Sequence, residues 1–203
     1  MLVLGLDPSL TGFGWCVHDA DARGKSRVVA KGRFKTNASQ LFVTRYVYLR
    51  EAVNKVLQSH NVDCVGVESP ISGETWSEGA YGLFLYVNEA VYLHRKDVVF
   101  FDPLTLKFLT KEDASFRKGK MFKADMINLA KADTGIGRWS NDEADAYHIG
   151  RFAARFFKLL RGEITPEVLL PTEEQKFLAP GIGTIHGENK RYFLYSKETN
   201  GFK

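Results

Sequence analysis

MLVLGLDPSLTGFGWCVHDA, residues 1–20, is the stretch that decides the fold. An apolar run from Leu2 to Leu6 leads directly into Asp7, and a loop containing proline, serine and glycine then leads into a second apolar run, Gly12 to Val17. Short apolar runs bounded by such residues are typical of buried β-strands. The stretch therefore predicts a strand, a tight loop and a second strand, with an acidic residue where the first strand ends.

The rest of the chain alternates between strand-like and helix-like patterns. Further strands are predicted at residues 27–35, 64–67 and 98–101, and helices at 39–58, at 80–94, within 104–132 and at 141–160. Ser140, followed three residues later by Glu143, is a capping-box pattern that marks the start of the last helix. The order indicates an α/β fold whose five-stranded mixed sheet joins three antiparallel strands to parallel ones, with helices on its flanks.

We expect one domain over residues 1–162, because 203 residues suffice for one well-buried core and are few for two. Prolines and glycines become frequent after Gly162. Residues 163–203 are therefore expected to form a partly extended C-terminal extension of unknown function, with one hairpin near residues 192–195.

The composition is that of an ordinary globular protein, with 44% hydrophobic and 26% charged residues and a net charge of +4. This modest positive charge favours anionic partners but does not by itself indicate nucleic acid. Cys16 and Cys64 are too few for a disulfide framework or a zinc site, so we expect two buried, reduced thiols. The N-terminus lacks a signal-peptide pattern and no apolar run approaches the roughly 20 residues that span a bilayer, so we expect a cytoplasmic protein with no membrane association.

Acidic residues stand where the predicted strands and the last helix would meet. Asp7 and Glu68 each follow a buried strand directly, and the element order places these two strands side by side in the sheet. Asp142 and Asp145 are three residues apart and therefore share one face of the last helix. If that face packs on the same end of the sheet, four carboxylates converge, and their mutual repulsion is relieved by divalent cations. Oxygen ligands favour Mg²⁺ or Mn²⁺, and two such ions can support phosphodiester hydrolysis.

Taken singly, each acid also has a structural explanation. An aspartate after a strand is commonly a turn former or a helix cap, and Asp142 could simply complement the dipole of the last helix. Glu143 is explained as the capping partner of Ser140. The metal-site hypothesis depends on the complete set of acids and not on any one of them.

Three short motifs resemble, in order, those of RuvC-type Holliday-junction resolvases. LGLDPS (4–9) with TGFG (11–14) resembles the opening motif, VGVE (65–68) the second and DEADA (142–146) the last. The resemblance extends from about residue 2 to residue 160. Each motif is weak alone, but three in order at fitting intervals are fairly specific.

The chain departs from the family pattern at three places. Ser9 stands where the family usually has glycine, residues 115–120 (SFRKGK) replace its usual glycine-rich loop, and the tail after Gly162 has no counterpart. These departures put the shape of both loops in doubt, while the second one adds positive charge.

The resemblance implies an RNase H-like fold and a homodimeric endonuclease that nicks opposed strands of a four-way DNA junction with two Mg²⁺ ions per site. By position, the metal-binding acids are Asp7, Glu68, Asp142 and Asp145, and the lysines near the scissile phosphate are Lys107 and Lys123. Each lysine has a plain alternative as a solvated surface charge. His148, one helical turn beyond Asp145, would either touch the site or be a partly buried structural histidine.

Two features are expected to hold DNA. The densest basic cluster consists of Arg117, Lys118, Lys120 and Lys123, and it would contact phosphates. Trp76 lies in a polar, glycine-containing loop after Glu68, where the family carries an aromatic residue that stacks into the junction centre. Stacking on a base stabilises binding by roughly 1–3 kcal/mol. A solvated loop and a core or dimer contact are the respective alternatives.

The predicted helix at 80–94 is apolar on more than one face. Leu83, Tyr86, Val87, Ala90 and Val91 could pack on the sheet, which leaves Phe84, Leu85 and Tyr92 for another surface. Such a patch is unusual on a monomer and fits a symmetric dimer; a larger monomeric core is the alternative.

Other functions use the same residues. An RNase H-fold nuclease acting on flaps, replication forks or RNA–DNA hybrids would need the same carboxylates. The sugar-kinase and actin group also places an aspartate after its first strand, but this chain is short for two such lobes and that group leaves the helical acid pair unexplained. A junction-binding protein without catalysis is not indicated, because all four acids are present.

Overall fold

The computed structural model describes residues 1–21, 27–69, 77–113, 122–169, 173, 177, 194–196 and 201–202. Its strands are β1 (Leu2–Asp7), β2 (Phe13–Asp19), β3 (Arg27–Phe34), β4 (Cys64–Glu68), β5 (Asp97–Phe101), β6 (Leu194–Ser196) and β7 (Gly201–Phe202). Its helices are α1 (Phe42–His60), α2 (Glu78–Leu93), α3 (Pro103–Asp113), α4 (Lys123–Thr134), α5 (Asn141–Leu160) and the short 3₁₀ helix η1 (Pro166–Val168). The order of the elements matches the α/β prediction.

All strands belong to one mixed sheet in the order β3-β2-β1-β4-β5-β6-β7. β1, β2 and β3 form the predicted antiparallel meander, and β4 and β5 extend it as parallel neighbours of β1. The five predicted strands are confirmed. Two short strands of the tail lengthen the sheet further, because β6 pairs antiparallel with β5 and then with β7. The hairpin of the tail therefore lies slightly later than predicted.

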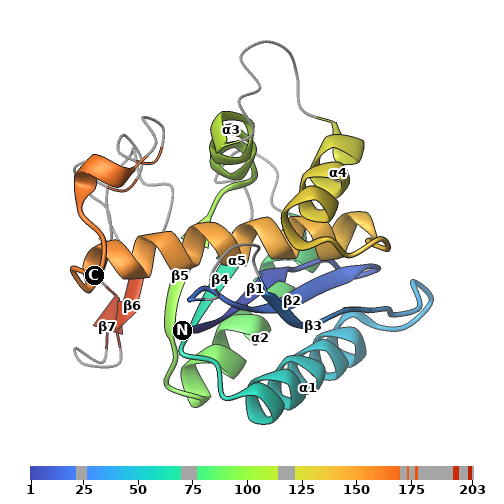
Figure 1. The fold of residues 1–203 in the computed structure, drawn as a ribbon. Helices are drawn as coiled ribbons and strands as arrows, with labels where there is room; N and C mark the ends of the chain where they lie inside the picture. The colour runs from blue at the N-terminus through green and yellow to red at the C-terminus, as the bar shows by residue number, and fades with distance from the viewer. Residues whose placement is uncertain are drawn as a thin grey trace.

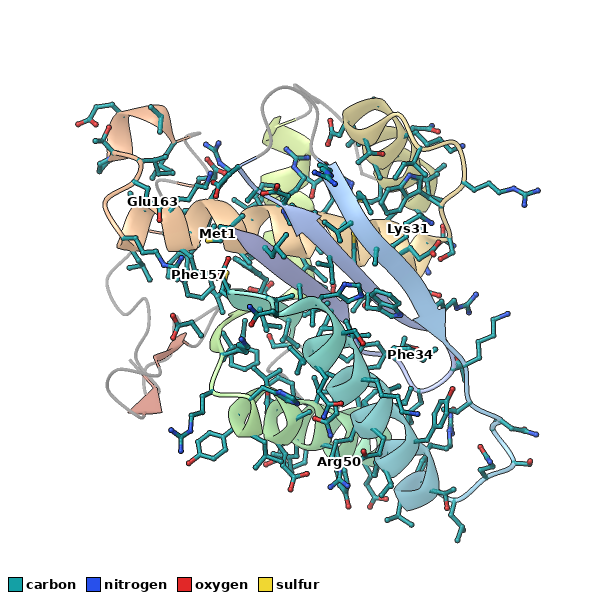
Figure 2. The ribbon with its side chains drawn as sticks, turned by 60° about the horizontal axis from the view of Figure 1, so that its bottom comes forward. Met1, Lys31, Phe34, Arg50, Phe157 and Glu163 are labelled. Atoms are coloured by element: carbon teal, nitrogen blue, oxygen red, sulfur yellow. The ribbon has the colours of Figure 1, made fainter. Side chains whose placement is uncertain are left out.

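Helices cover both faces of the sheet. α1 and α2 lie on one face, and α5 crosses the other, with α3 and α4 beside it (Figure 1). Figure 2 brings the α1 and α2 side forward and shows both helices below the sheet. One apolar core runs through these layers, from Leu49 of α1 and Val87 of α2, through Val65 of β4, to Phe152 of α5.

α2 confirms only part of the expected facing. Leu83, Val87, Ala90 and Val91 are buried as predicted, and Leu85 and Tyr92 are about half exposed. Phe84, which was expected on an outer surface, instead contacts Phe100 of β5 with ring centroids 5.3 Å apart. Tyr86 packs against Tyr46 of α1 at 5.3 Å.

α5 begins at Asn141 and ends at Leu160, as its sequence pattern predicts. Its capping box is formed: the Ser140 hydroxyl accepts from the Glu143 backbone N–H at 3.3 Å, and the Glu143 carboxylate accepts from the Ser140 backbone N–H at 2.8 Å. Satisfying these end groups fixes where the helix begins. The start of α5 is thereby fixed, and with it the positions of Asp142 in the first turn and Asp145 in the second.

Two glycines allow α5 to lie directly against the sheet. A Cβ atom at Gly5 of β1 would come within 1.9 Å of the Ala146 carbonyl oxygen, and one at Gly14 of β2 within 1.9 Å of the Asp142 carbonyl oxygen. No real Cβ approaches backbone so closely, so both positions require glycine for this packing. The backbone contact sets the height of α5 above β1 and β2.

Two smaller expectations also have an outcome. Cys16 and Cys64 are buried and form no disulfide, as predicted. Within the described ranges, no helix combines the length and apolar character needed to cross a membrane. The division of the chain at residue 162 stays a prediction, although the tail shares the sheet of the preceding residues.

Gly5→Ala tests the α5 contact. The new methyl group must displace the backbone of α5, so we expect a loss of about 1–3 kcal/mol or more in the free energy of unfolding, measured by urea denaturation. Gly137→Ala is the matched control, because a Cβ there meets no atom within 4 Å, and it should leave stability nearly unchanged. Equal stability of the two variants would contradict the assigned packing.

Candidate metal centre

Two of the predicted acids lie at one edge of the sheet. β1 and β4 are parallel neighbours with Leu6 paired to Val67, so the residues that follow, Asp7 and Glu68, lie side by side at the strand ends. Both side chains are partly exposed. Withdrawal from water raises the pKa of Asp7 well above its usual range, and the charges of Glu68, Asp145 and Asp142 raise it further.

The acids on α5 reach the same place. Burial first, and then the neighbouring charge of Asp142, raises the pKa of Asp145 to about 6. Burial and the charge of Asp145 raise the pKa of Glu68 to about 7. The structure therefore brings Asp7, Glu68, Asp142 and Asp145 within electrostatic range of one another. Because all four are partly exposed, small ions have access to them from solvent.

A third parallel strand also ends in an acid that sequence reasoning did not assign to the site. Asp102 follows β5, and its charge contributes to the raised pKa of Glu68. Its oxygens are already committed to the start of α3, because they accept from the Thr105 backbone N–H at 2.8 Å and the Thr105 hydroxyl at 2.6 Å. Asp102 is thus explained as a helix cap. It lies close to the end of the sheet where the four acids meet, which we call the acidic edge.

Arg33 is the main unforeseen member of the site. Its Nε lies 2.6 Å from Oδ2 of Asp142, and both side chains are partly exposed. Gly12 provides space for this pair, since a Cβ there would lie 2.4 Å from the Arg33 guanidinium and 2.7 Å from the Asp142 carboxylate. The guanidinium thus compensates the charge of one of the four acids.

The side chains fit divalent metal by their chemistry, although their positions do not yet form a closed ligand shell. In the described part of the chain, no three acidic, histidine or cysteine side chains are already grouped to hold an ion. The donors are all carboxylate oxygens, which suit Mg²⁺ or Mn²⁺. Their raised pKa values express a repulsion that a divalent cation would remove.

The two predicted lysines also lie near the acids. Lys123 is the first residue of α4, and its charge lowers the pKa of Asp7 and Asp145. Lys107, an exposed residue of α3, acts in the same direction on Glu68 and Asp145. Each lysine therefore contributes positive potential to the acids from the side on which α3 and α4 lie.

His148 is fully buried, and its Nε2 lies 3.0 Å from the Met126 carbonyl oxygen of α4. This contact favours its structural alternative, as a histidine that joins α5 to α4. Four other predicted residues, Trp76, Arg117, Lys118 and Lys120, lie outside the described residues.

The raised carboxyl pKa values predict a pH dependence of stability in metal-free protein. Glu68 titrates near 7 in the folded chain against an ordinary value of 4.5. The folded state therefore holds a proton that the unfolded chain releases, so this contribution is full below pH 4.5 and is lost as pH rises through 7. Relative to the parent protein, Glu68→Gln should therefore gain up to about 3 kcal/mol in the free energy of unfolding between pH 4.5 and pH 8. The measurement is urea unfolding in EDTA.

Glu163→Gln is the matched control for that measurement. Glu163 is exposed at the far end of α5 (labelled in Figure 2), so its substitution should leave the pH profile as it is. A Glu68→Gln profile that parallels the parent between pH 4.5 and 8 would show that Glu68 carries no such cost.

Comparison with known proteins finds one group repeatedly. The crossover junction endodeoxyribonuclease RuvC of Sphingopyxis alaskensis is 37% identical over 68 residues, which is 34% of this chain and 43% of that protein, so the match covers less than half of the relative. The RuvC of Rickettsia conorii is 24% identical over 157 residues, covering 73% of this chain and 94% of that one. No protein-family model matches the chain.

Solved structures agree in fold. Thermus thermophilus RuvC aligns with a TM-score of 0.64 at 21% identity, over 80% of this chain and 97% of that one. The same protein solved with a Holliday junction substrate aligns with a TM-score of 0.62 at 20% identity, again over 80% and 97%. At these identities the likeness shows a shared fold. In the order of its motifs and in its RNase H-like fold, the chain resembles the RuvC-type Holliday-junction resolvases.

Proposed function

We propose that the chain is a Mg²⁺-dependent endonuclease that resolves four-way DNA junctions or related branched DNA. The observation that carries the proposal is the convergence of Asp7, Glu68, Asp142 and Asp145 at one partly exposed edge of the sheet. Relatives and structural neighbours named as crossover junction nucleases support the same activity. RNA–DNA hybrids, flaps and forks are the substrates of the nearest alternative enzymes.

The four carboxylates are the proposed ligands of two divalent ions, with Mn²⁺ able to replace Mg²⁺. When bound, such ions activate water and neutralise the leaving oxygen in phosphodiester hydrolysis. The fixed strand ends hold Asp7 and Glu68, while the first two turns of α5 carry Asp142 and Asp145. For Oδ2 of Asp142 to serve as a ligand, its contact with Arg33 must open.

Lys107 and Lys123 are proposed to attract the scissile phosphate. Both are exposed, and both already influence the acids, so a phosphate held by the ions would lie within their electrostatic reach. The proposal for DNA binding also includes the stacking of Trp76 in an opened junction, and phosphate contacts by Arg117, Lys118 and Lys120. Base stacking and phosphate contact together would favour a branched duplex over a continuous one.

We infer a homodimer, because two cuts at a two-fold junction suit two related sites. α2 offers a surface for it: Tyr81, Leu85 and Tyr92 are 48%, 49% and 51% exposed. These positions recur at helical spacing, so they form one strip along α2. Phe42 and Val43 of the neighbouring helix α1 are also exposed, at 48% and 52%.

Asp7→Asn tests the catalytic proposal. The substitution keeps the shape of the side chain and removes its charge, so cleavage of a labelled four-way junction in Mg²⁺ should fall about a thousand-fold or more. Binding of the junction in EDTA, measured by fluorescence anisotropy, should persist. The proposal fails if Asp7→Asn cuts as fast as the parent.

The same assay separates the substrates. Parent protein should introduce symmetric paired nicks into a four-way junction and should cut a flap, a fork and an RNA–DNA hybrid of equal length more slowly. If the hybrid or the flap is cut faster than the four-way junction, the proposed substrate is wrong and one of the alternative nuclease activities is indicated. Parallel incubation without Mg²⁺ should give no product.

Leu85→Arg tests the dimer. A charge in the middle of the α2 strip should convert the protein to a monomer in sedimentation-velocity analysis, because an unpaired buried cation opposes association. Val168→Arg, at an equally exposed apolar position in η1, is the matched control and should remain dimeric. A monomeric parent protein, or a dimer that survives Leu85→Arg, would contradict an α2 interface.

A further inference from the structure

An open groove of about 570 Å³ lies beside the start of α5, next to the acidic edge. It is lined by Lys31 of β3, by Lys131 near the end of α4, and by Arg138 and Trp139 of the segment that joins α4 to α5. Glu143 of α5 contributes the one carboxylate of the lining. Of these residues only Glu143 was assigned a role from the sequence, as the capping partner of Ser140.

The wall of the groove is fixed by its own contacts. The Trp139 indole N–H donates to the Ile136 carbonyl oxygen at 3.1 Å, and the Trp139 ring packs against Tyr147 of α5 with centroids 5.4 Å apart. Lys31 (labelled in Figure 2) places its Nζ 4.7 Å from the centre of the Trp139 ring. A cation over an indole face is attracted to it, so Lys31 is held along this wall.

The groove carries more positive than negative charge. Three cations line it against one carboxylate, and that carboxylate is committed. Glu143 pairs with Lys31 at 3.1 Å and also accepts from the backbone and the hydroxyl of Ser140 at 2.8 and 2.9 Å. Lys131 and Arg138 are exposed, and neither has an ion-pair partner among the residues that the structure describes.

The position of the groove links it to the acidic edge. Lys31 and Arg33 alternate along β3, so their side chains leave the same face of the strand roughly 7 Å apart. Arg33 contacts Asp142, and Lys31 contacts the next residue, Glu143. A row of cations thus runs from the proposed cleavage site into the groove.

We propose that this groove binds the phosphodiester backbone of a DNA arm next to the cleavage site. Lysine and arginine offer only donors and carry positive charge, and the one carboxylate in the lining is already paired, so the groove suits the anionic phosphates of the backbone, whose charge does not vary with base sequence. Its contribution to binding is therefore independent of base sequence and sensitive to salt. The inference rests on the proposed function and names residues other than the basic cluster predicted from the sequence.

The test is the salt dependence of junction binding by a double variant, Lys131→Ala with Arg138→Ala. Dissociation constants for a labelled four-way junction are measured by fluorescence anisotropy in EDTA at several NaCl concentrations. Loss of two phosphate contacts should lower the slope of log Kd against log salt by about 2 and weaken binding about 10-fold or more at low salt.

Lys55→Ala with Lys96→Ala is the matched control. Lys55 lies on α1, on the opposite face of the sheet, and Lys96 precedes β5 at the strand end remote from the acids. The control removes the same charge and should keep the parental slope. An unchanged slope in the groove variant, or an equal decrease in the control, overturns the inference. The proposed function fails separately, if the parent protein neither binds nor cuts the junction.

Discussion

Backbone contact between α5 and the sheet is the constraint on which the acidic site depends. Gly5 and Gly14 lack the side chains that would lift the helix, so the Ala146 and Asp142 carbonyl groups lie directly on β1 and β2. Asp142 and Asp145, in the first two turns of α5, can then reach the acids at the strand ends. One methyl group added at Gly5 would therefore separate acids that are far apart in sequence without touching any of them, because the nearest atoms belong to Ala146 and Gly150.

Packing holds together charges that repel one another. The pKa of Glu68 and that of Asp145 rise to about 7 and 6 because burial and neighbouring carboxylates disfavour their ionised forms. Such a cost persists in a folded protein only when the surrounding structure supplies the stability to offset it. Here that support comes from the fully buried residues of α5, which anchor its length to β1, β2 and β4. A site of this kind is ready to gain stability from divalent cations.

The sequence predicts best what depends on local pattern. Apolar runs ending in an acid located Asp7 and Glu68, and the capping box with helical periodicity located both ends of α5. Arg33 and Lys31 were missed because the sequence does not show which side chains of β3 point toward α5. Their direction is set by the pairing of β3 with β2, and that pairing has a register shift at Val17/His18. The tail hairpin was predicted slightly too early in the chain, because strands of two or three residues are too short to show a periodic pattern. Phe84 was misassigned because its contact with Phe100 joins a helix to a strand and leaves no local signal in the sequence.

Two cations of β3 form ion pairs with neighbouring acids of α5: Lys31 with Glu143, and Arg33 with Asp142. The two acids differ in their other contacts. Glu143 is also the capping partner of Ser140, so its position is fixed by the helix start even without Lys31. Asp142 has Arg33 as its ion-pair partner among the described residues, and the pair is partly exposed, where such contacts contribute little to stability. In the proposed function, a divalent cation that takes Oδ2 of Asp142 would compete with Arg33, and a phosphate that takes the Arg33 guanidinium would compete with Asp142. Since each competitor would release the partner that the other binds, linkage predicts that metal and DNA backbone favour each other's binding at this edge.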